Sequence, residues 1–374
     1  PFSVDESSTS EIILEHSNEK ILKQIRVTKS DTRDSGRKLE GTVFDIIDSY
    51  ETVVETITTN SNGEALSSLL PYGAYTVKEK TPPVGFTISN EAHSVFIGDE
   101  KNEVYDVFTQ NEPTEITIFK KGKDTNGPLE GSHIQVFNEN DLLVYDGITD
   151  SVGRFDITEI PIGNYTFKEV KAPEGYTLST DTYVFEITKD GAESPDIYFE
   201  NDPTEVTITK IDYVSNKAIT DAEIEVFNAD GESIYKGRTD QAGQIILTHL
   251  PIGIYTAVET KAPDGYIKSE DAITFSIDEY GVVTGETEIE NCPTMLHIQK
   301  IDYDTDLPLT GAGFKVKNFL GLHLLNFTQD ENGAYWFDNE GEVSEVLVDE
   351  GGKVIIHGLP FGNYWIEESM TPEG

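Results

Sequence analysis

The sequence contains almost no cysteine: Cys292 is the only one among 374 residues. A single cysteine cannot form a disulfide within the chain, so disulfides are excluded as the source of stability. Basic residues are also scarce, with 27 lysines and arginines against 69 aspartates and glutamates and a net charge of −42. Such an acidic chain repels nucleic acid and anionic membranes, which excludes both as partners.

Long hydrophobic runs are absent as well. No stretch approaches 18 consecutive apolar residues, so we expect no membrane insertion. The first residues, Pro1–Glu6, do not resemble a signal peptide, and any export or anchoring signal is expected outside this sequence. The seven histidines are far apart, and no phosphate loop or Ser-His-Asp spacing occurs. We therefore expect no metal, no cofactor and no multiple-turnover enzyme.

What the sequence does contain is a fourfold repeat with a period near 90 residues. Its clearest marker is Leu/Ile-Pro-x-Gly-x-Tyr, found at 70–75, 160–165, 250–255 and 359–364. A polar turn ends in each of four glycines, namely Gly63, Gly153, Gly243 and Gly333. We interpret it as an Asx-type turn rather than a calcium loop, because no 12-residue ligand pattern follows. The period is too long for a solenoid and suits a small β-domain.

The local pattern predicts strands throughout. Val206–Lys210, Tyr165–Glu169 and Ile197–Asn201 alternate between apolar and polar residues, and no amphipathic helix is evident. Asn-x-Pro steps mark the domain ends, so that only short linkers separate the domains like beads on a string. The predicted boundaries are 21–112, 113–202, 203–292 and 293–374, with 1–20 as the terminal strands of a preceding or partner-chain domain.

The fourth copy differs from the others. Its Lys300 and Glu368 are 68 residues apart, against 49 for the matching pair in the third copy. We expect the extra residues to form a hairpin extension near 330–352. Trp336 in this stretch is expected to pack on its own domain, although contact with a partner is the alternative.

Three polar residue types recur at nearly fixed spacing. The lysines are Lys29, Lys120, Lys210 and Lys300; the glutamates are Glu79, Glu169, Glu259 and Glu368; the asparagines are Asn111, Asn201 and Asn291. Each follows large apolar residues at period two, as Val206, Ile208 and Lys210 do. Residues at this spacing share one strand face, so all three types are expected to point into the core.

A lysine, a glutamate and an asparagine buried together suggest covalent chemistry. Burial lowers a lysine pKa, and a neutral amine is a nucleophile. A protonated glutamate can polarise the asparagine carbonyl and shuttle a proton, so that the amine displaces ammonia and leaves an amide bond. The alternative is a buried ion pair with an asparagine hydrogen bond. The repetition with matched parity favours the cross-link, with a single turnover in each domain.

The lysine strand, the Tyr-x-x-x-Glu-x-x-x-Pro-x-Gly box and the terminal Asn-x-Pro resemble the Cna B-type (SpaA-like) domains of Gram-positive surface proteins and pilins. The resemblance covers almost the whole chain. It implies tandem Greek-key, transthyretin-like β-sandwiches with Lys–Asn isopeptide bonds assisted by glutamate. The implied bonds are Lys29–Asn111, Lys120–Asn201 and Lys210–Asn291, with Glu79, Glu169 and Glu259 as the assisting acids.

The two ends of the chain are expected to be incomplete domains. The fourth copy has Lys300 and Glu368 but no acceptor strand, whereas residues 12–18 keep the parity of a last strand that ends in Asn18. One interpretation is a stretch of a longer repetitive protein. The other is exchange of a strand between molecules, in which Asn18 of one copy bonds to Lys300 of the next in a head-to-tail fibre.

Three functions follow from these patterns. The leading one is a structural stalk or fibre shaft on a bacterial cell surface or wall, stiffened by internal isopeptide bonds and contacting neighbouring domains or further copies of itself. The second is an adhesin with a host or surface protein as ligand. The third is an accessory domain of an enzyme. The same polar chemistry inside each copy, with variable outer loops, favours the stalk.

Overall fold

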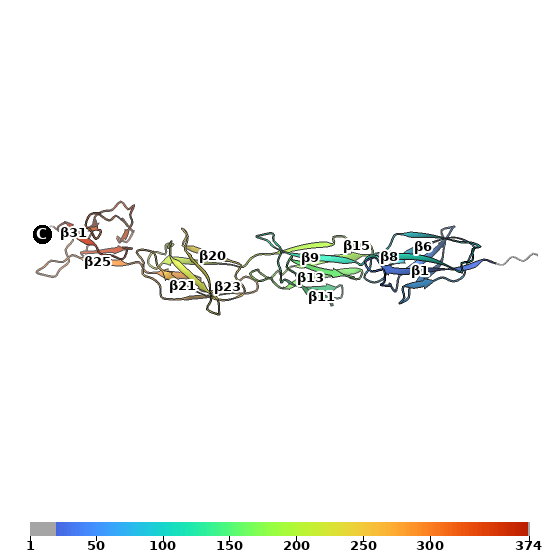
Figure 1. Cartoon of the computed structure of the whole chain (residues 1–374). Coiled ribbons are helices and arrows are strands. Elements are labelled where there is room, and N and C mark those ends of the chain that lie inside the picture. Colours follow the sequence, from blue (N-terminus) through green and yellow to red (C-terminus); the bar gives the residue numbers. More distant parts are fainter. Residues whose placement is uncertain (1–19, 373–374) are drawn as a thin grey trace, which may run out of the picture. The chain divides into compact units, whose positions relative to one another are not determined.

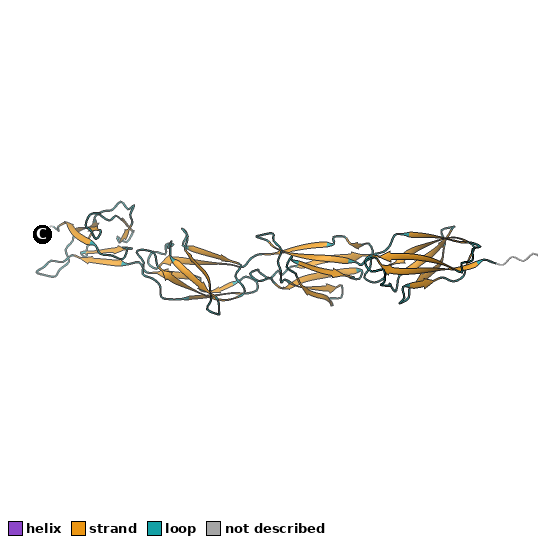
Figure 2. Ribbon diagram, viewed as in Figure 1, coloured by secondary structure: helices purple, strands orange, loops and turns teal. Residues whose placement is uncertain are grey.

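The structure is a computed structural model that describes residues 20–372. These residues form strands, turns and loops, with no helix among them (Figure 2). The described part therefore also contains no helix long and apolar enough to cross a membrane. The prediction of an all-β chain is confirmed. Asn18 and the predicted terminal strands at residues 1–19 lie outside the described residues.

The first repeat forms two sheets around one core. Its strands are β1 (Leu22–Asp31), β2 (Val43–Asp48), β3 (Val53–Thr58), β4 (Glu64–Leu66), β5 (Leu70–Pro71), β6 (Gly73–Thr81), β7 (Ala92–Ile97) and β8 (Val104–Asn111). One sheet has the order β3-β2-β6-β7, and in the other β1 lies between β4 and β8. Figure 1 shows β8 beside β1. The strands β1 and β8 run parallel, so the first and last strands of the domain are direct neighbours.

Alternation along the strands explains the core. Ile25 and Val27 of β1 are fully buried and pack with Phe44 of β2 and Val77 of β6, which lie in the opposite sheet. The intervening residues of β1 are partly accessible, as expected for a strand with one face on the core. The result is a β-sandwich whose two inner faces meet in a single hydrophobic cluster.

The second and third repeats have the same plan. The second contains β9 (Glu115–Gly122), β10 (His133–Asn138), β11 (Leu143–Ile148), β12 (Arg154–Thr158), β13 (Gly163–Lys171), β14 (Thr182–Thr188), β15 (Gly191–Ala192) and β16 (Asp196–Asn201). The third contains β17 (Glu205–Asp212), β18 (Glu223–Phe227), β19 (Ser233–Arg238), β20 (Gln244–Thr248), β21 (Gly253–Lys261), β22 (Ile273–Ile277), β23 (Val283–Gly285) and β24 (Glu288–Asn291). The first strand again lies beside the last, in the orders β12-β9-β16 and β20-β17-β24.

Two compact units divide the chain within the second repeat. The first extends to Lys121 and also holds Asn126–Lys171 and Thr180–Glu200. The second holds Gly122–Thr125, Ala172–Ser179 and the chain from Asn201 onward.

The fourth repeat has fewer strands. They are β25 (Met295–Gln299), β26 (Gly313–Lys317), β27 (Phe327–Gln329), β28 (Tyr335–Phe337), β29 (Val346–Leu347), β30 (Lys353–His357) and β31 (Trp365–Met370). The sheets have the orders β25-β30-β28-β27 and β29-β26-β31. Among the described residues, no strand pairs with the second edge of β25, the edge that β8 and β24 occupy in the first and third repeats.

The expected hairpin extension is present as the antiparallel pair β27 and β28. Trp336 packs on its own domain, as expected: its Nε1 donates to Asp330 Oδ2 at 3.1 Å, and its ring stacks on His357 at 4.6 Å. An Asx-type turn is also confirmed before β4, where Asn60 Oδ1 accepts the backbone N–H of Asn62 and Glu64.

One assignment within this motif was wrong. The amide of the repeat lysine donates to Gly63, Gly153 and Gly243 in the first three copies, but in the fourth copy Lys300 donates to Gly352 rather than Gly333. Asp349 closes that turn by accepting the N–H of Gly351 and Lys353. Gly333 instead belongs to the turn between β27 and β28, because the inserted hairpin contains an Asx turn of its own.

Candidate functional site

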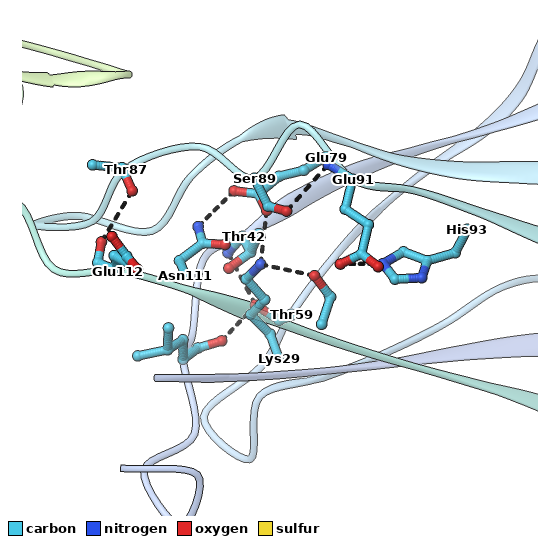
Figure 3. A network of polar contacts seen from close by, with 12 residues as sticks. Lys29, Thr42, Thr59, Glu79, Thr87, Ser89, Glu91, His93, Asn111 and Glu112 are labelled. Carbon is cyan, nitrogen blue, oxygen red and sulfur yellow. Dashed lines mark hydrogen bonds and ion pairs between the residues drawn. The ribbon is translucent and has the colours of Figure 1, made fainter. Parts of the chain in front are cut away.

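Three strands of the first domain bring Lys29, Glu79 and Asn111 together (Figure 3). Lys29 Nζ donates to Glu79 Oε2 at 2.7 Å, and Asn111 Nδ2 donates to Glu79 Oε1 at 2.7 Å. The carboxylate therefore lies between the amine and the carboxamide. Lys29 is 0% exposed, Glu79 4% and Asn111 2%. The three residues form a polar cluster inside an otherwise apolar core.

Strand register explains this convergence. Lys29 of β1 pairs with Thr109 of β8, and Asn111 follows two residues later on the same face. Glu79 of β6 pairs with Phe44 of β2 in the opposite sheet. Thr109 adds a contact that the sequence analysis missed, because its Oγ1 accepts a hydrogen bond from Lys29 Nζ at 3.2 Å.

The third domain repeats the cluster with a different set of contacts. Lys210 Nζ lies 2.5 Å from Asn291 Oδ1, and Asn291 Nδ2 donates to Glu259 Oε1 at 2.9 Å. Lys210 Nζ is 3.9 Å from Glu259 Oε1, so here the lysine contacts the carboxamide rather than the carboxylate. All three residues are buried. The backbone N–H of Ser269 also donates to Glu259 Oε2 at 2.7 Å.

In the second domain, Lys120 Nζ lies 3.8 Å from Glu169 Oε1, and both side chains are fully buried. Asn201 is 2% exposed at the end of β16, the strand next to β9. Lys120 Nζ also lies 3.8 Å from the ring centroid of Phe199. Ser132, which the sequence analysis did not select, donates its hydroxyl to Glu169 Oε1 at 2.6 Å.

Burial changes the acid–base behaviour of these lysines. Desolvation lowers the pKa of Lys120 and of Lys210 to about 8, and the nearby Glu169 and Glu259 only partly oppose it. Desolvation also lowers the pKa of Lys29, although the hydrogen bond that Lys29 donates to Glu79 opposes this effect. A lysine with a lowered pKa holds a larger fraction of the neutral, nucleophilic amine near neutral pH.

The fourth domain departs from the expected burial. Lys300 Nζ contacts Glu368 Oε2 at 2.9 Å, but their side chains are 26% and 29% exposed. We expected both residues on the core face. The physical reason is that β25 has a strand on one side only among the described residues, so that Leu296 and Ile298 before Lys300 are also only partly buried.

Several other expectations concern single residues or ions. Cys292 is exposed, as expected for a surface thiol. Within residues 20–372 there is no group of three or more histidine, cysteine, aspartate or glutamate residues that could hold a metal ion.

The fold and the repeated cluster define a class of tandem prealbumin-like β-sandwich domains. The family model described as "SpaA: Prealbumin-like fold domain" matches residues 23–112, 114–202, 204–292 and 294–374. The chain therefore belongs to this family, and the resemblance inferred from the sequence is confirmed.

Curated relatives come from staphylococci. The chain is 24% identical over 410 residues to serine-aspartate repeat-containing protein F of Staphylococcus epidermidis, which covers 88% of this chain and 23% of the relative. It is 24% identical over 406 residues to serine-aspartate repeat-containing protein D of Staphylococcus aureus strain Newman, which covers 92% of this chain and 30% of the relative. The chain thus spans less than a third of the length of these relatives.

Among solved structures, the Bacillus anthracis TIE protein is similar at 29% identity and a TM-score of 0.42, over 72% of this chain and 50% of that one. A streptococcal ancillary pilin is similar at 17% identity and a TM-score of 0.34, over 73% of this chain and 99% of that one.

Proposed function

We propose that this chain is part of the stalk of a Gram-positive surface protein, stiffened by Lys–Asn isopeptide bonds inside its domains. The observation that supports it best is the buried lysine, glutamate and asparagine cluster between the first and last strands of the first and third domains. An amide at this place joins the two parallel neighbours covalently. The staphylococcal origin of the relatives supports a Gram-positive source.

The chemistry follows from the contacts in the third domain. The neutral amine of Lys210 attacks the side-chain carbonyl carbon of Asn291, whose Oδ1 lies 2.5 Å away. The Lys–Asn C–N bond forms, and the bond from that carbon to Asn291 Nδ2 breaks. Glu259 accepts a proton from the attacking nitrogen and passes it to Nδ2, which leaves as ammonia. The fixed geometry replaces an external catalyst.

In the proposed reaction, the contacts of the first domain correspond to the stage before the amine attacks. Lys29 is paired with Glu79, and Asn111 Oδ1 is buried without a hydrogen-bond partner. Transfer of the Lys29 proton frees the amine to move toward Asn111. A buried lysine left as an ion pair gains little stability over an apolar replacement, so a stabilising role alone explains the repeated cluster poorly.

The intact mass of the denatured protein tests the proposal. Each bond releases one ammonia, so three complete bonds lower the mass by about 51 Da. Cross-linked peptides then assign each bond to its lysine and asparagine. The matched control is Glu259→Ala. We expect this variant to form no bond, and so to lose no ammonia, in the third domain, while the bond of the first domain still forms. An unchanged mass in the parent protein would contradict the proposal and leave buried ion pairs only.

Binding to a protein ligand is a second candidate, and one feature of the fourth domain favours it. Phe319, Leu320 and Leu322 at the turn after β26 are 63%, 66% and 73% exposed. Trp365, which is 62% exposed, donates its Nε1 to Phe319 O at 2.8 Å. At the places of Phe319 and Leu320 the second copy has Glu139 and Asn140 and the third copy has Ala229 and Asp230, so those two copies lack this apolar pair. Loss of surface-protein binding in Trp365→Ala and Leu320→Ser, with unchanged cross-linking, tests this role.

The head-to-tail fibre is a further proposal for the fourth domain. Lys300 and Glu368 form a pair at the available edge of β25, where a strand carrying an asparagine would complete the cluster. The proposed donor is Asn18 of a second copy. Multimers that survive heating in denaturant, and that disappear in both Lys300→Ala and Asn18→Ala, are the expected result. A purely monomeric band at high protein concentration would contradict it.

A further inference from the structure

Ser132 lies in a buried, hydrogen-bonded position beside the glutamate of the second domain. It is 0% exposed, and its hydroxyl donates to Glu169 Oε1 at 2.6 Å. Its backbone N–H donates to Thr149 Oγ1 at 3.0 Å, and Thr149 in turn donates to Leu129 O at 2.8 Å. Two hydrogen bonds thus fix the backbone from which the Ser132 hydroxyl reaches the carboxyl group.

The other domains keep this backbone arrangement but vary the side chain. The equivalent residues are Thr42, Ala222 and Ala312. Ser132, Thr42 and Ala222 each lie two residues before the strand partner of the glutamate, as the pairs Ile134–Glu169, Phe44–Glu79 and Ile224–Glu259 show. In the third domain the amide of Ala222 still donates to Thr239 Oγ1 at 3.1 Å. The backbone hydrogen bond at this position therefore forms whether or not the residue carries a hydroxyl group.

In the first domain the equivalent hydroxyl, that of Thr42, is present but makes no hydrogen bond. Thr42 is fully buried, and its Oγ1 has no hydrogen-bond partner. Its backbone N–H donates to Thr59 Oγ1 at 2.9 Å, and Figure 3 labels it in the same view as Lys29, Glu79 and Asn111. At present Lys29 occupies Oε2 of Glu79 and Asn111 occupies Oε1. When Lys29 gives up its proton and moves to Asn111, it leaves one carboxyl oxygen of Glu79. Thr42, two residues before the strand partner of Glu79, carries a buried hydroxyl without a hydrogen-bond partner.

In the third domain a backbone N–H, rather than a hydroxyl, donates to the glutamate. Ala222 has no hydroxyl, but the backbone N–H of Ser269 donates to Glu259 Oε2 at 2.7 Å while Asn291 occupies Oε1. A donor other than the asparagine thus contacts the carboxyl group in each complete domain: Lys29 at present in the first, Ser132 in the second and the Ser269 amide in the third.

We propose that the Ser132 hydroxyl, and the Thr42 hydroxyl after proton transfer, are positioning residues for the assisting glutamate; this rests on the isopeptide chemistry proposed above. A hydroxyl that donates to one carboxyl oxygen makes that oxygen the acceptor. The proton taken from the lysine nitrogen must then reside on the other oxygen, from which it passes to the departing asparagine nitrogen. The hydroxyl gains and loses no proton, so the atom balance of the reaction is unchanged.

The test follows the second-domain bond in the full-length chain with time. Protein is made in a short cell-free pulse, quenched in acid denaturant at intervals, and digested, and the Lys120–Asn201 peptide is quantified by mass spectrometry. We expect Ser132→Ala to slow this bond about tenfold. Ser132→Thr should restore most of the rate, because it returns the hydroxyl with one methyl group more, as in the equivalent Thr42 of the first domain. The first-domain bond in the same molecules is the internal reference and should be unaffected.

Two controls separate positioning from packing. Ala222→Ser should leave the third-domain rate unchanged, because Ser269 already supplies the donor. In an Asn201→Ala background, where the second-domain bond cannot form, Ser132→Ala and Ser132→Thr should unfold at similar urea concentrations if their folds are equally intact. Equal bond rates in Ser132→Ala and the parent, or failure of Ser132→Thr to restore the rate, would overturn the inference. Absence of every bond from the parent protein would overturn the isopeptide proposal instead.

Discussion

The proposed nucleophile in the first three domains is a buried lysine whose charge the core disfavours. Desolvation lowers the pKa of Lys120 and Lys210 to about 8, whereas Lys29 is also bonded to Glu79, which opposes the decrease. These differences give the same three residue types different starting states. Lys210 already contacts its asparagine, and Lys29 must first leave a carboxylate.

We predict that cross-linking in the second and third domains speeds up as the pH rises from 6 to 8. The amine attacks only when neutral, and its neutral fraction increases about tenfold per pH unit below the pKa and levels off above it. The measurement is the pulsed mass-spectrometry assay repeated across this pH range. Lys–Asn peptides that accumulate at one rate from pH 6 to 8 would contradict a rate-limiting deprotonation of the lysine.

The same pKa predicts how stability depends on pH when the bond cannot form. In Asn291→Ala, unfolded Lys210 binds a proton up to its ordinary pKa of 10.5, but folded Lys210 releases it above about 8. The unfolded state then binds more protons between these values, so the free energy of unfolding should increase from pH 8 to 10.5. Urea midpoints measure it, with Asn291→Ala/Lys210→Met as the matched control. Identical pH slopes in the two variants would count against a neutral buried lysine.

Parity along the strands was sufficient to predict the buried clusters of the first and third domains. The same rule would also have selected Thr42 and Ser132, which share a face with Phe44 and Ile134. They were missed because small hydroxyl residues near a strand entry are common and Ala222 breaks the repeat. Which donor each glutamate uses depends on side-chain distances that sequence spacing does not contain.

At the scale of elements, the turn before the fourth strand of each of the first three domains fixes the backbone of the repeat lysine. The amide of Lys120 donates to Gly153 O at 2.8 Å, and the φ of Gly153 is +72°. A Cβ at Gly153 would lie 2.5 Å from Lys120 O, a backbone atom that cannot rotate away. The glycine is therefore required by close approach as well as by its backbone conformation.

We predict that Gly153→Ala destabilises the second domain by about 3 kcal/mol, from the combined clash and left-handed strain. Gly131→Ala is the matched control, because its φ is +88° but a Cβ there meets nothing within 4 Å. Strain alone should cost it about 1 kcal/mol. Urea denaturation in the Asn201→Ala background measures both without the covalent bond. Equal decreases in the free energy of unfolding in the two variants would show that the close approach of Gly153 to Lys120 O adds nothing to the cost of the substitution.

Sequence periodicity predicted the element types well but failed at an insertion. The fourth copy has several Gly-ended Asx turns, including those that end in Gly333 and Gly352, and only the contact of Lys300 with Gly352 identifies the one that is equivalent to Gly153. The partial exposure of Lys300 and Glu368 was also not evident from parity, since a strand face is buried only where neighbouring strands complete the sheet. Both errors concern tertiary neighbours rather than local pattern.

At the scale of the whole molecule, repetition of one bond position has a mechanical consequence. The last strand of the first and third domains runs parallel to the first strand and beside it, and the proposed bonds join these strands near their ends. A pull on the two ends of such a domain passes from the entering strand through the amide to the departing strand. The rest of the domain lies within the closed loop and bears little of the load, which is the property a stalk needs.

Single-molecule pulling gives the last prediction. Lys210 and Asn291 are 81 residues apart, and a loop of this length adds about 280 Å when it is extended. The parent chain should show no such step from its cross-linked domains, because the amide holds each loop closed. Asn291→Ala should add one step of that length, and Asn291→Ala/Asn111→Ala two. Reduction with dithiothreitol should change nothing, since Cys292 cannot form an internal disulfide. Steps of full domain length in the parent chain, beyond the single step that its fourth domain can contribute, would mean that the strands of the first three domains are held by hydrogen bonds alone. The buried clusters would then have no mechanical role.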